Sequence, residues 1–292
     1  MTGLLFGLDV TTSADPSGVD PVADARTAEA LGFDFVSASD HPCGSHPTYE
    51  TWTMLSWIAA STSRIRVATR VLGVPYRAPA MVAKMAETLS RLSGGRLILG
   101  LGGGSADEEF RAFGLGVPSP RDKVDGLEDA VRIARGLWSS DRFSHDGRVH
   151  IVDGATIAPK AEHAIPIWLG TYGPRALAVT GRHADGWIPS LGLTPPSAVP
   201  QQRARILDAA LDAGRDPSAI TCAYNLQIRI DPVVGSEQSA VVGPVDYAVT
   251  QLVRFTEPGF TAFNLQPVGP DRPTQLDRLA SEVIPGVRAA TR

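Results

Sequence analysis

Polar residues follow an apolar, strand-like run near the start of the sequence, where they could form a site. Asp40 and His41 come directly after residues 33–39. An imidazole at a strand end can act as a general base or hydrogen-bond a ring carbonyl, although an adjacent Asp and His can also be a satisfied polar pair. His41 and Asp40 are therefore the candidate catalytic residues. No further His, Asp or Glu stands at metal-ligand spacing from them, so we expect no metal site.

Two glycine-rich turns are the candidate binding segments. They follow residues 96–101 and 166–169, and contain Gly102, Gly103, Gly104 and Ser105 in the first and Gly170, Thr171, Tyr172, Gly173, Pro174 and Arg175 in the second. Glycines let a ligand approach the backbone, and a helix that begins at Pro174 would present unpaired N–H groups to a phosphate. Both segments are also compatible with tight turns that bind nothing. The first is not a P-loop, because no Gly-Lys-Ser or Gly-Lys-Thr follows it.

The elements that would position these residues alternate between short apolar runs and helical patterns. Strand-like runs cover residues 4–10, 33–39, 65–72, 96–101, 166–169, 186–189, 220–230 and 262–267. Helical patterns cover residues 21–31, 52–62, 79–92, 124–138, 199–211, 245–255 and 276–283, with a short helix from Pro174 and a stop before Pro285. Eight such units predict an α/β fold, a (β/α)8 TIM barrel that residues 1–292 form as a single domain.

The alternation is interrupted at about residues 139–165, between the fourth and fifth strands. Asp146-Gly147 and Asp153-Gly154 predict hairpin turns within this insertion, which is either a lid over the site or a surface hairpin. The competing fold is a doubly wound open sheet. That fold would place a glycine-rich dinucleotide turn after the first strand, and residues 9–12 contain no glycine, so we favour the barrel.

Composition excludes several classes of protein. The 27 Lys and Arg against 31 Asp and Glu give a net charge of −4, which is not the charge of a nucleic-acid-binding protein. With 43% hydrophobic and 20% charged residues, the chain is typical of a folded protein. The first ten residues resemble a strand and not a signal peptide, and no run of 18 apolar residues could span a membrane. We therefore expect a cytoplasmic protein.

Four stretches of the sequence resemble the bacterial luciferase-like family of (β/α)8 flavin and deazaflavin oxidoreductases. They are residues 28–41, ending in Ser39-Asp40-His41; residues 69–79; residues 89–102, which begin Leu89-Ser90-Arg91-Leu92-Ser93-Gly94-Gly95-Arg96; and residues 170–187. The third stretch is the most specific. The likeness is clear from about residue 3 to residue 190 and weaker beyond. It implies the same barrel fold.

The resemblance also implies a cofactor and the residues around it. Members of the family that use the deazaflavin coenzyme F420 commonly carry an Asp–His pair after the second strand, whereas many FMN-type members carry a Glu–His pair. Asp40 and His41 therefore imply F420, with FMN as the alternative. By likeness, both residues would face the ring and the substrate. Val71, Leu72 and Gly73 would form a bulge behind the ring, often with a non-proline cis peptide.

The remaining contacts follow from the same resemblance. Residues 102–105 and 171–175 would hold the ribityl chain and phosphate of the cofactor, and Trp52 and Trp187 would form walls of the substrate pocket. Cations would be needed near the acidic tail of F420, and the candidates are Arg77, Lys160, Arg175 and Arg182. One departure concerns the substrate: F420-dependent sugar-phosphate dehydrogenases of this family have a catalytic glutamate where this sequence has Ser105, which argues against a sugar phosphate.

The expected activity is F420-dependent hydride transfer between C5 of the deazaflavin and a small organic substrate. His41 or water would transfer the matching proton. The alternatives are an FMN-dependent luciferase-like monooxygenase and a non-catalytic flavin- or deazaflavin-binding protein. By resemblance, we also expect a homodimer.

Overall fold

Eight parallel strands close into a barrel in the computed structural model, which describes residues 3–15, 18–43, 46–235 and 239–292. The strands are β1 (Leu5–Asp9), β2 (Phe35–Ala38), β3 (Arg66–Thr69), β5 (Leu97–Gly102), β8 (Ile167–Leu169), β9 (Gly186–Trp187), β10 (Thr221–Ile230) and β12 (Ala262–Pro267). The ring closes where β12 pairs with β1, with Leu5 opposite Ala262. The predicted barrel is confirmed. The alternative open sheet is wrong, because each of these strands pairs with two neighbours and the ring has no edge.

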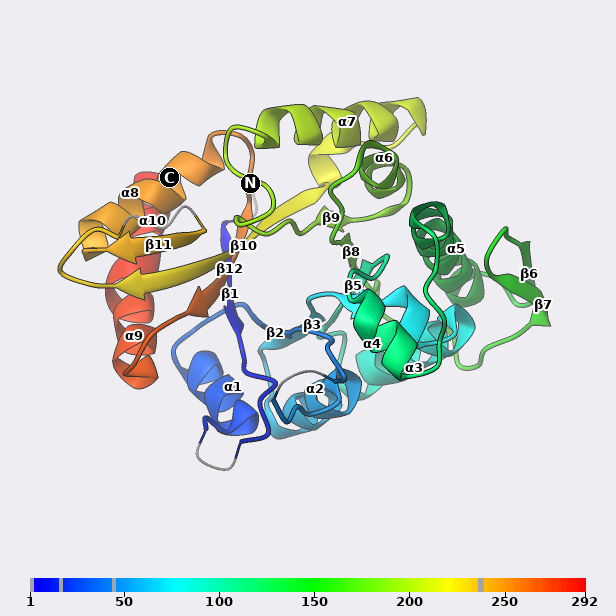
Figure 1. Ribbon diagram of the computed structural model, residues 1–292, viewed down its shortest axis with the longest axis horizontal. Coiled ribbons are helices and arrows are strands. Elements are labelled where there is room, and N and C mark those ends of the chain that lie inside the picture. Colours follow the sequence, from blue (N-terminus) through cyan, green and yellow to red (C-terminus); the bar gives the residue numbers. More distant parts are fainter. Residues whose placement is uncertain (1–2, 16–17, 44–45, 236–238) are drawn as a thin grey trace.

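Helices follow the strands and cover the outside of the barrel (Figure 1). They are α1 (Pro21–Ala30), α2 (Thr51–Ser61), α3 (Pro79–Leu92), α5 (Pro120–Ser139), α6 (Pro174–His183), α7 (Val199–Asp212), α8 (Val245–Thr256), α9 (Arg272–Arg278) and α10 (Ile284–Ala290). Many begin with proline, which fits a first turn because that position needs no N–H donor. The Asp20 carboxylate caps α1 by accepting a hydrogen bond from the Val22 N–H at 2.9 Å.

The inside of the barrel is filled by an apolar layer. Its members come from different strands and are Phe35, Ala68, Ile98, Trp168, Ile188, Ala223 and Ala262. The rings of Phe35 and Trp168 meet edge to face, with centroids 5.5 Å apart. A Cβ at Gly7 would lie 2.1 Å from the Phe35 ring, so only glycine leaves room for that ring. The barrel is therefore packed and not hollow.

A second, polar layer lies above the first, toward the carboxyl ends of the strands. Side chains two residues apart on a strand share a face, so each residue of the polar layer lies two positions after an apolar residue of the same strand. Ser37 follows Phe35, Asn225 follows Ala223 and Asn264 follows Ala262. Ser37 and Asn264 are fully buried and Asn225 nearly so. This layer gives the mouth of the barrel a polar floor.

The insertion after β5 contains one hairpin, formed by β6 (Phe143–Asp146) and β7 (Ile151–Ala155). The predicted turn at Asp146-Gly147 is found at the end of β6. The predicted turn at Asp153-Gly154 is wrong, because both residues lie inside β7, where Gly154 adopts a φ of 56° without ending the strand. The hairpin packs on the outer side of α5 (Figure 1).

Several short elements were not predicted. They are β4 (Leu72–Gly73), α4 (Asp107–Ala112), β11 (Ala240–Gly243), and the 3-10 turns η1 (Val74–Tyr76) and η2 (Pro217–Ala219). The expected helix stop before Pro285 is wrong: a π-helical turn, η3 (Leu279–Val283), joins α9 to α10. Pro285 lies at the second position of α10, directly after this π-helical turn. No helix in the described part of the chain is long and apolar enough to cross a membrane.

Candidate active site

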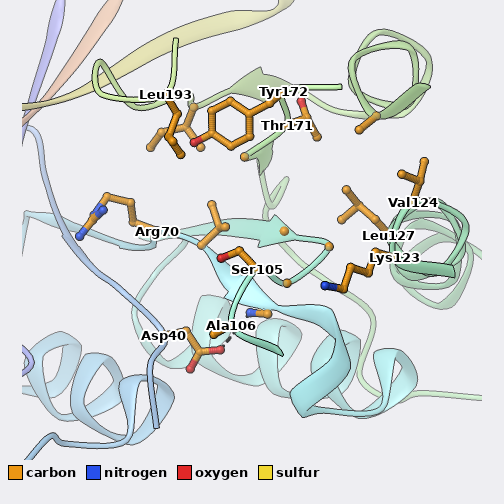
Figure 2. Close-up of a pocket in the computed structure, with 18 of the residues that line it drawn as sticks. Asp40, Arg70, Ser105, Ala106, Lys123, Val124, Leu127, Thr171, Tyr172 and Leu193 are labelled. Carbon is orange, nitrogen blue, oxygen red and sulfur yellow. Dashed lines mark hydrogen bonds between the residues drawn. The ribbon is translucent and has the colours of Figure 1, made fainter. Parts of the chain in front are cut away.

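A cavity of about 410 Å³ opens where β2, β3, β5 and β8 end. In Figure 2, Tyr172 and Leu193 lie on one side of it and Ser105 on the other, while Arg70 and Lys123 lie toward opposite ends. The predicted residues that line it are Asp40, His41, Val71, Gly73, Gly102, Gly103, Gly104, Ser105, Thr171, Tyr172 and Gly173. The ends of four strands, separated by up to about 130 residues of sequence, therefore meet in one space, as a barrel requires.

Five of the residues predicted to contact the ring, the phosphate or the substrate lie outside the described lining of this cavity. Leu72 is buried behind it, while Pro174 and Arg175 belong to α6, and Arg175 pairs with Asp125 instead. The prediction that Trp52 and Trp187 wall the substrate pocket finds no support in their positions. Trp52 lies in a separate apolar groove between α2 and α3.

Trp187 is fully buried and supports the second glycine turn from behind. Its indole N–H donates to the Thr171 carbonyl at 2.9 Å, and its ring stacks on Phe260. The Thr171 hydroxyl in turn lies 2.7 Å from the hydroxyl of Thr180 on α6. Trp187 therefore fixes the shape of the turn and does not contact the space inside.

The bulge after β3 contains the non-proline cis peptide that the resemblance implied, between Arg70 and Val71. Val71 directs its side chain onto two glycines of the neighbouring strand ends. A Cβ at Gly102 would lie 2.6 Å from Val71 Cγ2, and one at Gly170 would lie 3.2 Å from it. These glycines are thus explained by the close approach of Val71, which forms one surface of the cavity.

The second glycine turn leaves the N-terminus of α6 open. Gly173 is its N-cap and provides no side-chain hydrogen bond, and a Cβ at Gly173 would have nothing within 4 Å. The first N–H groups of a helix attract anions, because they carry the positive end of the helix dipole. Lys123, on the first turn of α5, also lines the cavity and pairs with Asp107. This end of the cavity suits a phosphate.

Asp40 is held on all sides by the protein. Its side chain is 1% exposed and accepts from the Gly73 N–H at 2.9 Å and from both terminal nitrogens of Arg77 at 2.8 and 3.0 Å. Arg77 also pairs with Glu50, the N-cap of α2. The carboxylate of Asp40 therefore ties the end of β2 to the bulge at β4 and α2. It positions the wall behind His41.

His41 lies in a hydrogen-bonded chain with two residues that the sequence analysis did not assign. Its Nδ1 is 3.0 Å from Glu109 Oε1, and the second Glu109 oxygen accepts from the Tyr76 hydroxyl. Burial and the Glu109 carboxylate raise the pKa of Tyr76, so its hydroxyl stays protonated and donates. With a carboxylate at Nδ1, the proton of a neutral imidazole sits there, and Nε2, which has no partner among the described residues, is the basic nitrogen.

Glu109 was not assigned to the site, because an acidic run such as Asp107, Glu108 and Glu109 commonly complements the dipole at a helix N-terminus and binds nothing. Its place in the sequence could have indicated the site, because Glu109 lies four residues after Ser105, in the segment that follows a predicted strand end. Lys123 and Arg70 were likewise not assigned as lining residues, although Arg70 directly follows β3 and Lys123 lies in the first turn of α5.

The predicted tail-binding cations are already engaged with the protein. Arg77 binds Asp40 and Glu50, Lys160 donates to the Leu137 and Ser140 carbonyls, and Arg182 pairs with Glu128. None of these cations and no residue of 139–165 is among the described lining residues of the cavity, and the hairpin of the insertion packs on the outer side of α5. In the part of the chain that the structure describes, no group of three His, Cys, Asp or Glu side chains could hold a metal ion.

The fold is a parallel (β/α)8 barrel, and its mouth combines a helix N-terminus suited to a phosphate with a histidine that has a free ring nitrogen. Together these features are typical of barrel enzymes that bind a phosphorylated ligand. Residues 4–233 match the family model described as luciferase-like monooxygenase, and the chain belongs to this family.

Relatives and solved structures extend the comparison. The chain is 29% identical to an F420-dependent glucose-6-phosphate dehydrogenase of Intrasporangium calvum, over 94% of this chain and 97% of that protein. It is 30% identical to a protein of that name from Nakamurella multipartita, over 96% and 80% of the two chains. The fold matches that of an F420-dependent secondary alcohol dehydrogenase in complex with an F420-acetone adduct, with a TM-score of 0.87, 22% identity and coverage of 98% and 99%.

Proposed function

We propose that this protein is an F420-dependent oxidoreductase that transfers a hydride between C5 of the deazaflavin and a carbon of a small organic substrate. The observation that carries the proposal is the cavity itself. It joins an uncapped helix N-terminus, two glycine-rich turns and a histidine with a free Nε2 in one space. The full-length similarity to F420-dependent dehydrogenases supports the choice of cofactor.

The residues present fit such a cofactor. The α6 N-terminus and Lys123 provide the positive charge that a phosphate needs, and the backbone of residues 102–105 and 171–173 borders the space between this end and Val71. The apolar surface of Val71 suits one face of a planar ring. When bound, the deazaflavin supplies the hydride chemistry, and the protein supplies binding, orientation and exclusion of water.

The chain's own residues then handle the proton. We propose that His41 Nε2 accepts the proton of a substrate hydroxyl, or returns it in the reverse direction. Glu109 fixes the tautomer and stabilises the imidazolium that forms, while Tyr76 orients Glu109. Asp40, through Arg77 and the Gly73 N–H, keeps the bulge in place.

The substrate is proposed to differ from that of the relatives. Ser105 stands where the resemblance implies a catalytic glutamate for sugar-phosphate oxidation. The carboxylate of Glu109 enters the site from the following helix and is already bound to His41 and Tyr76, so it does not replace the missing group.

Equilibrium binding of F420 and FMN to the purified chain tests the cofactor. We expect F420 to bind and FMN to bind at least about tenfold more weakly. Tight FMN binding without F420 affinity would favour the alternative monooxygenase. If F420 binds but a panel of neutral and anionic alcohols and carbonyl compounds gives no turnover, the protein is a non-catalytic carrier.

We also propose that the protein is a homodimer. Large apolar side chains are exposed on α2 and α3, where Trp57, Met81 and Leu92 are 68%, 59% and 82% exposed. Leu92 lines the apolar groove that holds Trp52, and Trp57 lines a second groove between α1 and α2. Exposed apolar surface of this kind is typical of a protein interface. Sedimentation equilibrium should find a dimer that Leu92→Glu dissociates and Leu211→Glu, at an exposed site on α7, does not; a monomeric wild type would contradict the proposal.

A further inference from the structure

We propose that Arg70 is the receptor for an oxyanion on the substrate, so that the substrate is a small organic anion and not a neutral alcohol or ketone. The proposal rests on the proposed function, because it adds a substrate class to the same cavity. Carboxylate and phosphate groups share the chemistry that a guanidinium recognises, and the experiment below separates them.

The geometry of Arg70 leaves both of its terminal nitrogens without a partner among the described residues. Its Nε donates to Asp9 Oδ1 at 2.9 Å, and its side chain is 15% exposed in the lining of the cavity. None of the described residues accepts a hydrogen bond from its Nη1 or Nη2. A guanidinium offers a planar fork of N–H donors that fits a carboxylate or phosphate. Asp9 thus holds one edge of Arg70 and leaves the outer fork to a ligand.

The polar floor of the barrel holds Asp9 in turn. The Ser37 hydroxyl lies 3.3 Å from Asp9 Oδ1 and 2.9 Å from Asn264 Oδ1. Asn264 donates to Asn225 at 2.8 Å, and Asn225 donates to the Ser190 hydroxyl at 2.9 Å. Buried networks in which each group has a partner are rigid. This one runs beneath the mouth from Arg70 to Ser190, and both of those residues line the cavity.

The positions of the charges assign Arg70 to the substrate and not to the cofactor phosphate. Arg70 and Lys123 lie toward opposite ends of the cavity (Figure 2), and Lys123 accompanies the α6 N-terminus. The carboxylate of Asp40 is neutralised by Arg77. The end of the cavity away from the phosphate subsite therefore has a guanidinium that Asp9 holds through Nε and whose two terminal nitrogens are unused by the described residues.

Calorimetric titration of the F420-saturated protein tests this directly. Oxidised F420 cannot reduce a ketone, so pyruvate and acetone bind without turnover and differ by a carboxylate in place of a methyl group. Inorganic phosphate is the second anionic probe, and saturation with F420 keeps it out of the cofactor's own phosphate subsite. We expect at least one anion to bind about tenfold or more tightly than acetone. Tighter pyruvate identifies a carboxylate, and tighter phosphate identifies a phosphate.

Variants assign the preference to Arg70. Arg70→Gln should abolish the preference for an anion over acetone. Arg70→Lys, which keeps the charge but lacks the planar fork of donors, should weaken this preference. Arg66→Gln, on an exposed arginine at the other end of β3, should leave it intact. Equal binding of anions and acetone by the wild type would overturn the proposal even if the variants failed to fold, as would an unchanged preference in Arg70→Gln. Failure of the wild type to bind F420 would instead contradict the proposed function.

Discussion

The two rims of the barrel use the same kinds of polar residue in opposite ways. At the rim where the strands begin, Glu29 accepts from the backbone N–H groups of Ser63, Arg64 and Ile65, and Arg96 donates to carbonyls of the same loop. At the rim where the strands end, α6 is uncapped, His41 keeps a free Nε2 and Arg70 keeps an open fork. Groups whose partners lie in the chain stabilise the fold, and groups with spare hydrogen-bonding capacity are left for a ligand.

The comparison predicts that substitutions at the first rim change stability and those at the second change chemistry. The largest effect is expected for Arg96→Met. It removes hydrogen bonds to the Ala59, Ile65 and Ser93 carbonyls at 2.6 to 2.9 Å and should lower the free energy of unfolding by about 3 kcal/mol. Urea denaturation measures this. Arg66→Met, at an exposed residue of the same rim, is the control, and an equal loss in both variants would break the comparison.

His41→Ala is the converse test at the mouth. If His41 Nε2 transfers the proton, turnover should fall at least about 100-fold, equivalent to about 2.7 kcal/mol in the barrier. The side chain is 53% exposed, so the urea midpoint should hardly move. Steady-state kinetics and denaturation of the same preparation give both values. Unchanged turnover would remove the role assigned to His41.

Glu29→Gln tests the first rim through pH. Burial alone would raise the pKa of Glu29. The hydrogen bonds from the N–H groups of Ile65, Arg64 and Ser63 outweigh burial and lower this pKa to about 2. Because the folded-state pKa is depressed, this stabilisation is complete above the unfolded value of about 4.5 and is lost as the pH falls from there toward 2. At pH 7 we expect Glu29→Gln to cost about 2 kcal/mol, with the difference from wild type shrinking over that acidic window. A difference independent of pH would contradict the assignment.

The smallest expected effect is that of Glu109→Gln. A positioning residue acts through His41, so kcat should fall about tenfold while KM for the substrate stays nearly constant. Glu108→Gln, on the exposed neighbouring carboxylate, should leave both values unchanged. A rise in KM without loss of kcat would make Glu109 a substrate-binding residue instead.

Much of this fold was predictable because its signals are local. Apolar runs and helical spacing gave all eight barrel strands, and the Gly173-Pro174 turn predicted an open helix N-terminus that the structure contains. The partner that a polar side chain selects is not a local property. Asp40 lines the cavity, but its partners Arg77 and the Gly73 N–H were not predicted, because they reach it only where the bulge after β3 folds back onto β2.

The same limit explains the other differences at the site. Trp52 and Trp187 were predicted to form walls of the substrate pocket, but Trp52 lies in the groove between α2 and α3, and Phe260 and Thr171 contact Trp187. Glu109 reaches His41 only because the unpredicted helix α4 directs it there. Such contacts depend on how loops pack in space, which spacing along one chain does not determine.

The central claim is that the open groups at the mouth form one site for a planar, phosphorylated redox cofactor. A crystal structure of the protein soaked with F420 tests it most directly. We predict that the phosphate lies at the N-terminus of α6 beside Lys123, with the ring against Val71 and its reactive face open toward His41 and Arg70. A cofactor bound elsewhere, or with its phosphate at the Arg70 end, would contradict the account.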